Sequence, residues 1–588
     1  MCGIAGNLNF SSGPITKKRI NRVLKSMYHR GPDSSGFFQT SIGNCYLSLM
    51  HTRLSIIDKD ASSNQPFISN NCVLIFNGEI FNYIELKKEL KNKGFIFKTQ
   101  SDTEVVIKSY VAWGVECVDR FEGMWSFALY NIEKKQLILS RDRLGEKPLF
   151  IFSSLKTYSF ASEISALSLL LNGPLYPNND SIKSLLVNGY KSIYKQDWTF
   201  FKGVREIPPA SNIIINVNSN SYNVSEAKKY WDLKYKPHKR EENETHAILK
   251  ERLISAVKIR MRSDVPLAFC LSGGVDSSTI AAIACKILNH NISTFSIIDN
   301  DSRYNEKDEI DRNVESLESK HFFIKTDKSN FIEKLEKQIA YRNAPVFTLS
   351  YFMHAQISEY MNKKGFKVSV SGTGADELFT GYYDHYNFWL ADMFKEEKFK
   401  DLVDDWKKGY GKNVRNDYLK DPLCFIKNPR NRDHIYPNRS IFNNFLYSPL
   451  EKKILEHNFS SNLLRNRMMN ELFQEFVPVA LHEDDFNSMT FSVENRSPFL
   501  DSKLIEFAYS IPNQLLVKNG MLKWPLRALG EGIVPDKIRF NKIKRGFNAS
   551  IMSLINLDNP NTKERLLSES PIFDLIKRDS IESFINTN

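Results

Sequence analysis

The middle of the chain alternates between short apolar runs and amphipathic stretches, which restricts the possible fold more than any other feature. The apolar runs predict strands at 265–271, 292–298, 321–324 and 366–370. The amphipathic stretches predict helices from Ser277, at 305–318 and at 349–364. Because strands separated by helices form a parallel sheet with helices on its faces, we predict an α/β unit here. The helical, aromatic and basic sequence beyond residue 385 predicts a helical C-terminal extension of this unit.

The first 165 residues show a different pattern, with more strands and fewer helices. Strands are predicted at 46–50, 73–76, 125–130 and 136–140, and a helix at 16–28. A second helix is predicted from Ser101, because Ser101 and Glu104 have the spacing of a capping box. The length of 588 residues allows about two to four domains, and the two patterns favour two.

Composition argues against several classes of protein. Seven cysteines without a CxxC pair predict neither a disulfide framework nor a zinc site, so we expect the reducing cytoplasm. No apolar run reaches the ~20 residues that a transmembrane helix needs, so we expect no membrane insertion. The net charge of +12 is dispersed among acidic residues, which argues against nucleic acid as a partner.

A glycine turn follows the first strand of the α/β unit, with the sequence Ser272-Gly273-Gly274-Val275-Asp276-Ser277-Ser278. Glycines let the backbone approach an anion, and the following helix offers N–H groups, so the turn is typical of a phosphate site. It lacks the lysine of the GxxxxGK[ST] loop. Asp276 would repel a phosphate without a cation between them, which indicates Mg²⁺. The alternative is a tight turn whose serines bind nothing.

A second glycine turn, Ser371-Gly372-Thr373-Gly374-Ala375-Asp376-Glu377, follows a later strand of the same unit. Parallel sheets bind ligands at the carboxyl ends of their strands, so the two turns are expected to face one another across a crevice. Asp276 and Asp376 are then placed to share the metal ion.

Cys2 directly follows the initiator methionine. Removal of Met1 would give this residue both a thiol and a free α-amine, and the amine can accept the thiol proton near neutral pH. Cys2 is therefore a candidate nucleophile that carries its own base. The alternative is a cysteine that stands second by chance.

Seven segments together resemble the glutamine-hydrolysing asparagine synthetase family, namely 1–6, 29–33, 77–80, 140–145, 272–278, 371–382 and 496–501. The resemblance covers nearly the whole chain. It implies a class II glutamine amidotransferase domain, an N-terminal-nucleophile αββα sandwich, over residues 2–190. It also implies a connecting segment over 191–240 and an ATP pyrophosphatase domain with a parallel sheet over 241–588.

For the N-terminal domain, the resemblance implies that Cys2 attacks the amide of glutamine. Asn77 and Gly78 match the positions that stabilise the oxyanion. The positions that hold glutamine are matched by Arg53, Asn77, Glu79 and Asp102. Taken singly, Arg53 and Asp102 are also compatible with a surface ion pair.

For the C-terminal domain, the resemblance implies a set of nucleotide-binding residues: Leu271, Ser272, Gly273, Gly274, Asp276, Ser277, Ser278, Ile297, Ser371, Gly372 and Lys544. Asp276 and Asp376 are expected to hold Mg²⁺. Lys544, in a basic segment near the C-terminus, is expected to neutralise charge on the phosphates; the alternative is one more surface lysine.

The implied reaction is that of a carbon–nitrogen ligase. Glutamine is hydrolysed at Cys2, and the ammonia passes through the protein to a carboxylate activated as an acyl-adenylate. The products are an amide, AMP and pyrophosphate. ATP and Mg²⁺ are the expected cofactors, small molecules the expected partners, and a homodimer is possible within the family.

Two residues depart from the family pattern. Thr373 stands where most members have an acidic residue, and Phe486 stands where arginine is usual. Three hypotheses stay open: an asparagine synthetase acting on aspartate, a relative that amidates another carboxylate, such as a hexuronic acid sugar of a bacterial surface polysaccharide, and a non-catalytic homologue. The retained Cys2, Asn77 and Asp276 argue against the third.

Overall fold

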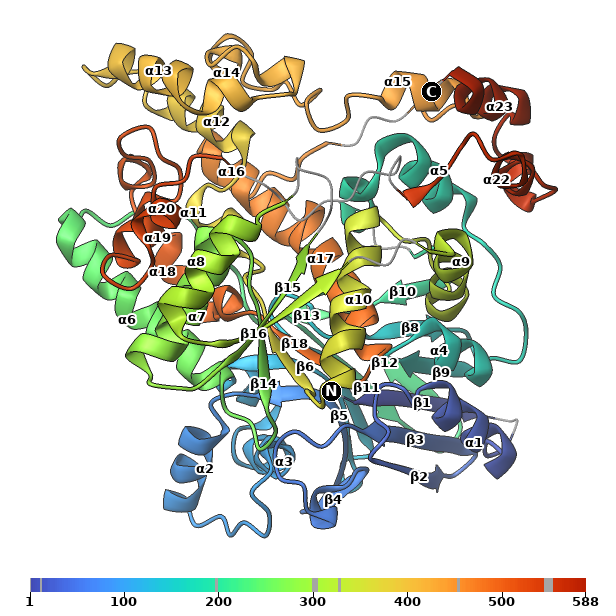
Figure 1. The fold of residues 1–588 in the computed structure, drawn as a ribbon. Helices are drawn as coiled ribbons and strands as arrows, with labels where there is room; N and C mark the ends of the chain where they lie inside the picture. The colour runs from blue at the N-terminus through green and yellow to red at the C-terminus, as the bar shows by residue number, and fades with distance from the viewer. Residues whose placement is uncertain are drawn as a thin grey trace.

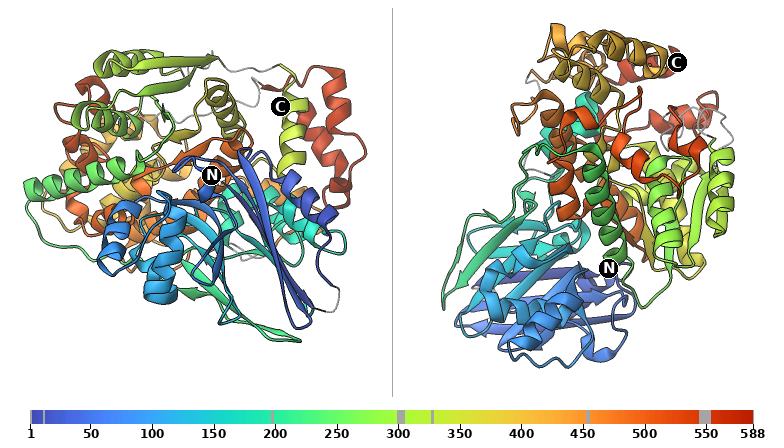
Figure 2. Two further views of the ribbon diagram at one scale, coloured as in Figure 1. Left: turned by 90° about the horizontal axis from the view of Figure 1, so that it is seen from below. Right: turned by 90° about the vertical axis from the view of Figure 1, so that its left-hand side faces the viewer.

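The computed structural model describes residues 2–10, 13–195, 199–298, 305–325, 329–451, 455–543 and 554–587. The chain forms an N-terminal unit of strands, blue to teal in Figure 1, and a C-terminal unit of a smaller sheet with many helices, green to red. Figure 2 shows the N-terminal sheets on one side of the C-terminal helices. Among the described helices, none has the length and apolar composition needed to cross a membrane.

The N-terminal unit contains two antiparallel sheets. The first has six strands in the order β10 (Val204–Glu206), β8 (Phe150–Ser153), β9 (Thr157–Ala161), β1 (Gly3–Phe10), β3 (Cys45–Arg53), β2 (Ser34–Ile42). The second has the order β12 (Tyr222–Val224), β11 (Ser211–Val217), β7 (Gln136–Arg141), β6 (Gly123–Asn131), β5 (Cys72–Ile80), β4 (Phe67–Ser69), with β13 (Lys228–Lys229) also paired to β11. The four strands predicted in this region lie within β3, β5, β6 and β7, as expected.

The two sheets pack face to face, and helices cover their outer faces. Leu47 of β3 and Val73 of β5 belong to the apolar core between the sheets. The outer face of the first sheet packs against α1 (Lys17–Ser26) and α4 (Ile164–Leu170). The outer face of the second packs against α2 (Tyr83–Asn92) and α3 (Asp102–Trp113). This is the predicted αββα sandwich.

The start of α3 agrees with the prediction from Ser101, but the capping box does not close. The Ser101 side chain accepts a hydrogen bond from the Thr103 N–H. The Glu104 carboxylate bonds to the N–H groups of Lys98, at 3.0 Å, and Thr99, at 2.7 Å, rather than reaching back to Ser101. The carboxylate thereby fixes the loop before the helix.

Residues 191–240, expected to be a connecting segment, contribute four strands to the two N-terminal sheets: β10, β11, β12 and β13. Three of these strands have only two or three residues, too few to show a period in the sequence. In the opposite direction, α5 (Asn179–Asn188) reaches the C-terminal unit, where Asn188 accepts a hydrogen bond from Arg439 at 2.8 Å.

The C-terminal sheet is parallel throughout, in the order β16 (Lys320–Lys325), β15 (Ser293–Ile298), β14 (Leu267–Cys270), β17 (Val368–Val370), β18 (Glu494–Arg496). The helices of this part are α6 (Glu242–Arg260), α7 (Val275–Ala282), α8 (Lys307–Leu317), α9 (Phe331–Arg342) and α10 (Leu349–Lys363). Phe269 of β14 packs with α6 and α7, and Ala268 packs with α10 on the other face. The four predicted strands are thus confirmed, and β18, whose three residues are all polar, is an addition.

Beyond β17 the described chain is mainly helical, as expected. Its helices are α11 (Ala375–Phe379), α12 (Tyr383–Asp392), α13 (Phe399–Lys408), α14 (Cys424–Lys427), α15 (Arg439–Asn444), α16 (Leu463–Asn470), α17 (Val477–Met489), α18 (Ser502–Ala508), α19 (Trp524–Leu529), α20 (Asp536–Arg539), α22 (Pro560–Leu566) and α23 (Arg578–Thr587). The two units share an apolar cluster in which Phe81 and Met124 of the first pack with Val368 and Met489 of the second.

Candidate active sites

Cys2 lies at the start of β1, buried at 7% exposure. Its backbone nitrogen donates a hydrogen bond to Asn77 Oδ1 at 3.0 Å, and its carbonyl oxygen accepts one from Arg30 Nε at 3.0 Å. Burial raises the pKa of the Cys2 thiol, while an N–H of Leu54 and the charge of Arg53 oppose that increase. A nearby base is therefore needed to generate the thiolate.

Asn77 and Gly78 come from the middle of the buried strand β5, next to Cys2. Asn77 is fully buried, and its amide nitrogen donates to Ser126 Oγ at 3.5 Å. Gly78 has φ +151°, and a Cβ atom there would lie 2.1 Å from the Met124 carbonyl oxygen. Only glycine fits this close approach of two strands.

Arg53 ends β3, and the loop after that strand holds its guanidinium. Nη1 donates to the Asp60 carbonyl oxygen at 2.9 Å and to Asn64 Oδ1 at 2.8 Å, and Nη2 donates to the Asp58 carbonyl oxygen. Arg53 is 4% exposed, so it is not part of a surface ion pair. The loop fixes a cation close to Cys2, where its charge acts on the thiol.

Glu79 and Asp102 place two buried carboxyl groups in the same region. Burial, the Asp102 charge and the Glu494 charge raise the pKa of Glu79 well above its ordinary value. Burial also raises the pKa of Asp102 to about 6, although the N–H of Ile80, 2.9 Å from Oδ2, opposes the shift. Two carboxyl groups that are difficult to ionise together favour a cationic ligand such as an ammonium group.

In the C-terminal unit, the first glycine turn connects β14 to α7, with Gly274 as the N-cap of the helix. Ser272 and Ser277 are hydrogen-bonded through their hydroxyl oxygens at 3.0 Å. The Gly273 N–H donates to Glu306 Oε2 at 3.2 Å. A carboxylate of the chain thus binds the turn that was predicted to bind an anion.

The second feature of this site is a lysine between two carboxylates. Lys523 Nζ lies 2.6 Å from Asp276 Oδ2 and 2.6 Å from Asp376 Oδ1. Burial alone would lower the pKa of Lys523, but the two carboxylates raise it above its ordinary value. Sequence analysis predicted that Asp276 and Asp376 lie close together, but it missed Lys523, because a lone lysine 247 positions from Asp276 has no local signal.

The same pair of carboxylates fits a divalent cation by its chemistry. Both are oxygen donors of the kind that Mg²⁺ prefers, and Asp276 Oδ1 is buried without a hydrogen-bond partner among the described residues. Lys523 supplies positive charge that balances the carboxylates of Asp276 and Asp376. Lys544, the cation expected from the sequence, lies outside the described residues.

A cavity of about 250 Å³ lies between the two glycine turns. Its lining includes the predicted nucleotide-binding residues Leu271, Ser272, Asp276, Ser277, Ile297, Ser371 and Gly372. Gly273, Gly274 and Ser278 form the turn behind this surface, and the Ser278 hydroxyl bonds to the Gly274 carbonyl oxygen at 2.6 Å. The carboxyl ends of β14, β15 and β17 thus meet at one cavity, as parallel sheets require.

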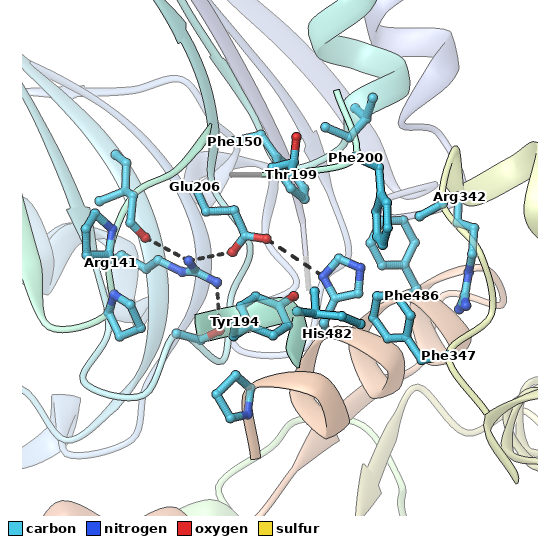
Figure 3. Close-up of a pocket in the computed structure, with 18 of the residues that line it drawn as sticks. Arg141, Phe150, Tyr194, Thr199, Phe200, Glu206, Arg342, Phe347, His482 and Phe486 are labelled. Atoms are coloured by element: carbon cyan, nitrogen blue, oxygen red, sulfur yellow. Dashed lines mark hydrogen bonds and ion pairs between the residues drawn. The ribbon is translucent and has the colours of Figure 1, made fainter. Parts of the chain in front are cut away.

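The two residues that depart from the family pattern line different cavities. Thr373 belongs to the cavity between the glycine turns. Phe486 lines a separate cavity of about 150 Å³, where Figure 3 shows it beside His482 and Phe347. His482 stacks on Phe347 with ring centroids 5.6 Å apart. Thr373 and Phe486 therefore do not share a cavity, although Phe486 and the Thr373 partner Asp484 belong to the same helix, α17.

Helix α17 connects the two sites. Its Asp485 accepts hydrogen bonds from both terminal nitrogens of Arg30, at 2.8 and 3.2 Å, and Arg30 also bonds to the Cys2 carbonyl oxygen. The preceding residue, Asp484, lines the cavity between the glycine turns. Two successive residues of one helix thus face the two sites.

A third acidic cluster, Asp384, His385 and Glu471, has the spacing of a metal site but contains its own cation. Arg467 lies 3.0 Å from Asp384 and 2.7 Å from Glu471. The guanidinium therefore supplies the positive charge that a metal ion would bring.

Comparisons with known proteins divide the chain into two matched regions. Residues 1–231 match the glutamine amidotransferase domain, and residues 248–588 match asparagine synthase. Asparagine synthetase [glutamine-hydrolyzing] 1 of Bacillus subtilis is 28% identical over 99% of this chain and 92% of its own length. Asparagine synthetase [glutamine-hydrolyzing] 3 of the same organism is 28% identical over 92% of this chain and 86% of its own length. Amidase chyE of Penicillium rubens is 28% identical over 88% of this chain and 83% of its own length. The chain belongs to the asparagine synthase family of glutamine-hydrolysing ligases, with a glutamine amidotransferase domain at its N-terminal end.

Proposed function

We propose that this ligase makes asparagine from aspartate, with glutamine as the nitrogen donor and ATP as the activating substrate. A carboxylate resists ammonia because oxide is a poor leaving group, and transfer of AMP to its oxygen supplies a good one. The observation that carries the proposal is the pair of carboxylates, Asp276 and Asp376, that two facing glycine turns bring to within 2.6 Å of one lysine nitrogen.

In the N-terminal unit, the Cys2 thiol attacks the amide carbon of glutamine. Loss of Met1 leaves the α-amine of Cys2 free to take the thiol proton and to return it to the leaving ammonia. Asn77 and the N–H of Gly78 stabilise the oxyanion, and the buried position of both keeps water away from it.

The same unit recognises the amino-acid end of glutamine by charge. The Arg53 guanidinium binds the α-carboxylate. Glu79 and Asp102 bind the α-ammonium, whose positive charge removes the repulsion between the two buried carboxylates. The α-ammonium of glutamine thus supplies positive charge beside Glu79 and Asp102.

In the C-terminal unit, the glycine turns bind the phosphates of ATP, and Leu271 and Ile297 contact the nucleoside. Asp276 and Asp376 would hold Mg²⁺, which would neutralise the phosphates. Glu306 leaves the Gly273 N–H when the phosphates arrive, because both need the same donor. Lys523 stays near the two carboxylates and faces the departing pyrophosphate.

Ammonia moves from Cys2 to the adenylate inside the protein, along the side of α17 that carries Asp484 and Asp485. Glutamine labelled with ¹⁵N in its amide, supplied together with unlabelled ammonium, measures this transfer. We expect the label to enter the product in excess of its share in the mixed pool. Product labelled in proportion to the pool would contradict internal transfer.

The acceptor is tested by pyrophosphate release. The reaction contains glutamine, Mg²⁺ and ATP, with either aspartate or a panel of hexuronic acid sugars, and the amide product is identified by mass. We expect release and a new amide only with aspartate. If pyrophosphate is released only with a uronic acid, that sugar is the acceptor instead of aspartate, and the rest of the proposal stands.

We also propose that the protein works in the cytoplasm and forms a homodimer. All seven cysteines are unpaired in the structure, as in a reducing compartment. Light scattering of the purified protein tests the dimer, and a monomer at micromolar concentration would contradict it.

A further inference from the structure

Amide formation needs a proton acceptor in the C-terminal cavity. When ammonia attacks the acyl carbon, its nitrogen becomes positively charged and must lose a proton before the amide forms. Thr373, on the second glycine turn, has a hydroxyl group that cannot accept this proton. The described residues that line the cavity include three carboxylates, Asp276, Glu306 and Asp484.

Two of these carboxylates are engaged elsewhere in the cavity. Asp276 is bonded to Lys523 Nζ at 2.6 Å. Glu306 accepts the Gly273 N–H at 3.2 Å, on the turn that binds phosphate in the proposed function. Asp276 also packs against Gly372 of the second glycine turn, but its carboxylate is held by Lys523.

Asp484 lies against that second turn and is held as an acceptor. Its Oδ2 accepts a hydrogen bond from Thr373 Oγ1 at 3.4 Å and another from Asn495 Nδ2 at 3.3 Å. Asn495 also donates to Ser371 Oγ at 3.2 Å, which ties the carboxylate to the turn. Both donors use Oδ2, so Oδ1 is the oxygen that is left to receive a proton.

An imidazole lies next to Oδ1. His354 Nδ1, from α10, is 3.7 Å from Asp484 Oδ1, and the two side chains are 34% and 16% exposed. The ring is therefore placed to orient the carboxylate and to pass a proton on to solvent. Asp484 also precedes Asp485, whose contact with Arg30 leads back to Cys2, so it lies on the side from which ammonia arrives.

We propose that Asp484 is the catalytic base of amide formation, with His354 as its positioning residue. The nitrogen lone pair of ammonia forms the C–N bond, and one N–H proton moves to Asp484 Oδ1. The C–O bond to AMP then breaks, and its electron pair leaves on the phosphate oxygen. This assignment rests on the proposed function, because it requires an acyl-adenylate in this cavity.

The test compares Asp484→Asn with Glu359→Gln, a control on α10 whose carboxylate pairs only with the exposed Lys363 among its described contacts. The acceptor is whichever carboxylate supports pyrophosphate release by the wild type. We expect Asp484→Asn to release pyrophosphate and hydrolyse glutamine near the wild-type rates, while amide formation falls roughly 100-fold. Equal loss of pyrophosphate release and amide formation would overturn the proposal.

Two further measurements separate a base from a structural residue. Hydroxylamine is a better nucleophile than ammonia, so Asp484→Asn should lose less activity with hydroxylamine than with ammonia. Glutamate at position 373 would reach the same space, so Thr373→Glu should restore amide formation in the Asp484→Asn background. Equal losses with both nucleophiles and no rescue would overturn the assignment. A wild type that releases no pyrophosphate with any acceptor would instead contradict the proposed function.

Discussion

Single charged residues decide how both sites are prepared for their ligands. In the C-terminal cavity, Lys523 neutralises Asp276 and Asp376, and Glu306 accepts the Gly273 N–H. These are the charges that a metal ion and a phosphate would otherwise supply. In the N-terminal pocket Arg496 lies 4.0 Å from Glu79, but burial still shifts the pKa values of Glu79 and Asp102 upward.

Removing the Lys523 charge should make the fold dependent on magnesium. In Lys523→Met, Asp276 and Asp376 lose their cation, and we expect the free energy of unfolding to fall by about 2 kcal/mol. The loss is smaller than for a fully buried ion pair because the two carboxylates are partly exposed. Mg²⁺ should restore more stability to this variant than to the wild type. Thermal unfolding with and without Mg²⁺ measures both effects. Lys518→Met, which breaks the exposed pair with Glu242, is the control, and an equal response to Mg²⁺ would contradict the prediction.

Glutamine binding should weaken as the pH falls through about 6. The pKa of Asp102 is raised to about 6, so its carboxylate is present above that pH and protonated below it. The α-ammonium of glutamine binds the carboxylate, so the KM for glutamine should rise as the pH is lowered. Asp102→Asn should raise KM and change this dependence, because Glu79 then titrates without the neighbouring charge of Asp102. Steady-state glutaminase assays that separate KM from kcat provide the test, and a pH-independent KM in the wild type would count against it.

At the scale of elements, α17 is the connection between the sites. Arg30 and Asp485 are both fully or almost fully buried, and burial of Asp485 is outweighed by Arg30 and Lys147, which hold its pKa below the ordinary value. Moving the helix away from the N-terminal unit would therefore separate the buried pair of Arg30 and Asp485. Asp484 on the same helix gives the second site a fixed relation to the first.

Breaking the ion pair of Arg30 and Asp485 should lower the free energy of unfolding more than breaking a surface ion pair does. Asp485→Asn leaves Arg30 with Glu163 as its other partner, and we expect a loss of about 3 kcal/mol. Asp421→Asn, whose partner Lys427 is exposed, should lose at most about 1 kcal/mol. Midpoints of urea unfolding compare the two variants. Similar losses in both would show that the Arg30–Asp485 pair contributes little to stability.

At the scale of the whole molecule, the two units divide one reaction between them. The cavity between the glycine turns is lined by the C-terminal unit alone, and Cys2 with Asn77 belongs to the N-terminal unit. The units meet through an apolar cluster, through the buried ion pair of Arg30 with Asp485 and through an exposed ion pair of Arg262 with Glu85. Because each site belongs to one unit, a substitution in one site can remove its activity and leave the activity of the other site.

Cys2→Ala should separate the two activities. Glutamine-dependent synthesis should fall by at least about 100-fold because the nucleophile is gone. Synthesis from added ammonia should continue, because the C-terminal cavity is unchanged. Product formation is measured with each nitrogen source, and Cys45→Ala, a buried cysteine of the same unit, serves as the control. Loss of both activities in Cys2→Ala would refute the division of labour.

The sequence by itself determined the order of the strands from β14 to β17, three of the helices between them and the two glycine turns, because side-chain period and turn chemistry are local properties. The αββα class of the N-terminal unit followed from the family resemblance. It did not predict β1, β2, β4, β8 to β13 or β18, and most of these strands have only two to four residues, too few to show a period in the sequence. The tertiary structure alone decided which charges meet. Lys523 reaches Asp276 across 247 positions, and Arg30 reaches Asp485 across 455. Such pairs depend on the path of the whole chain, since no local pattern brings two distant charges together.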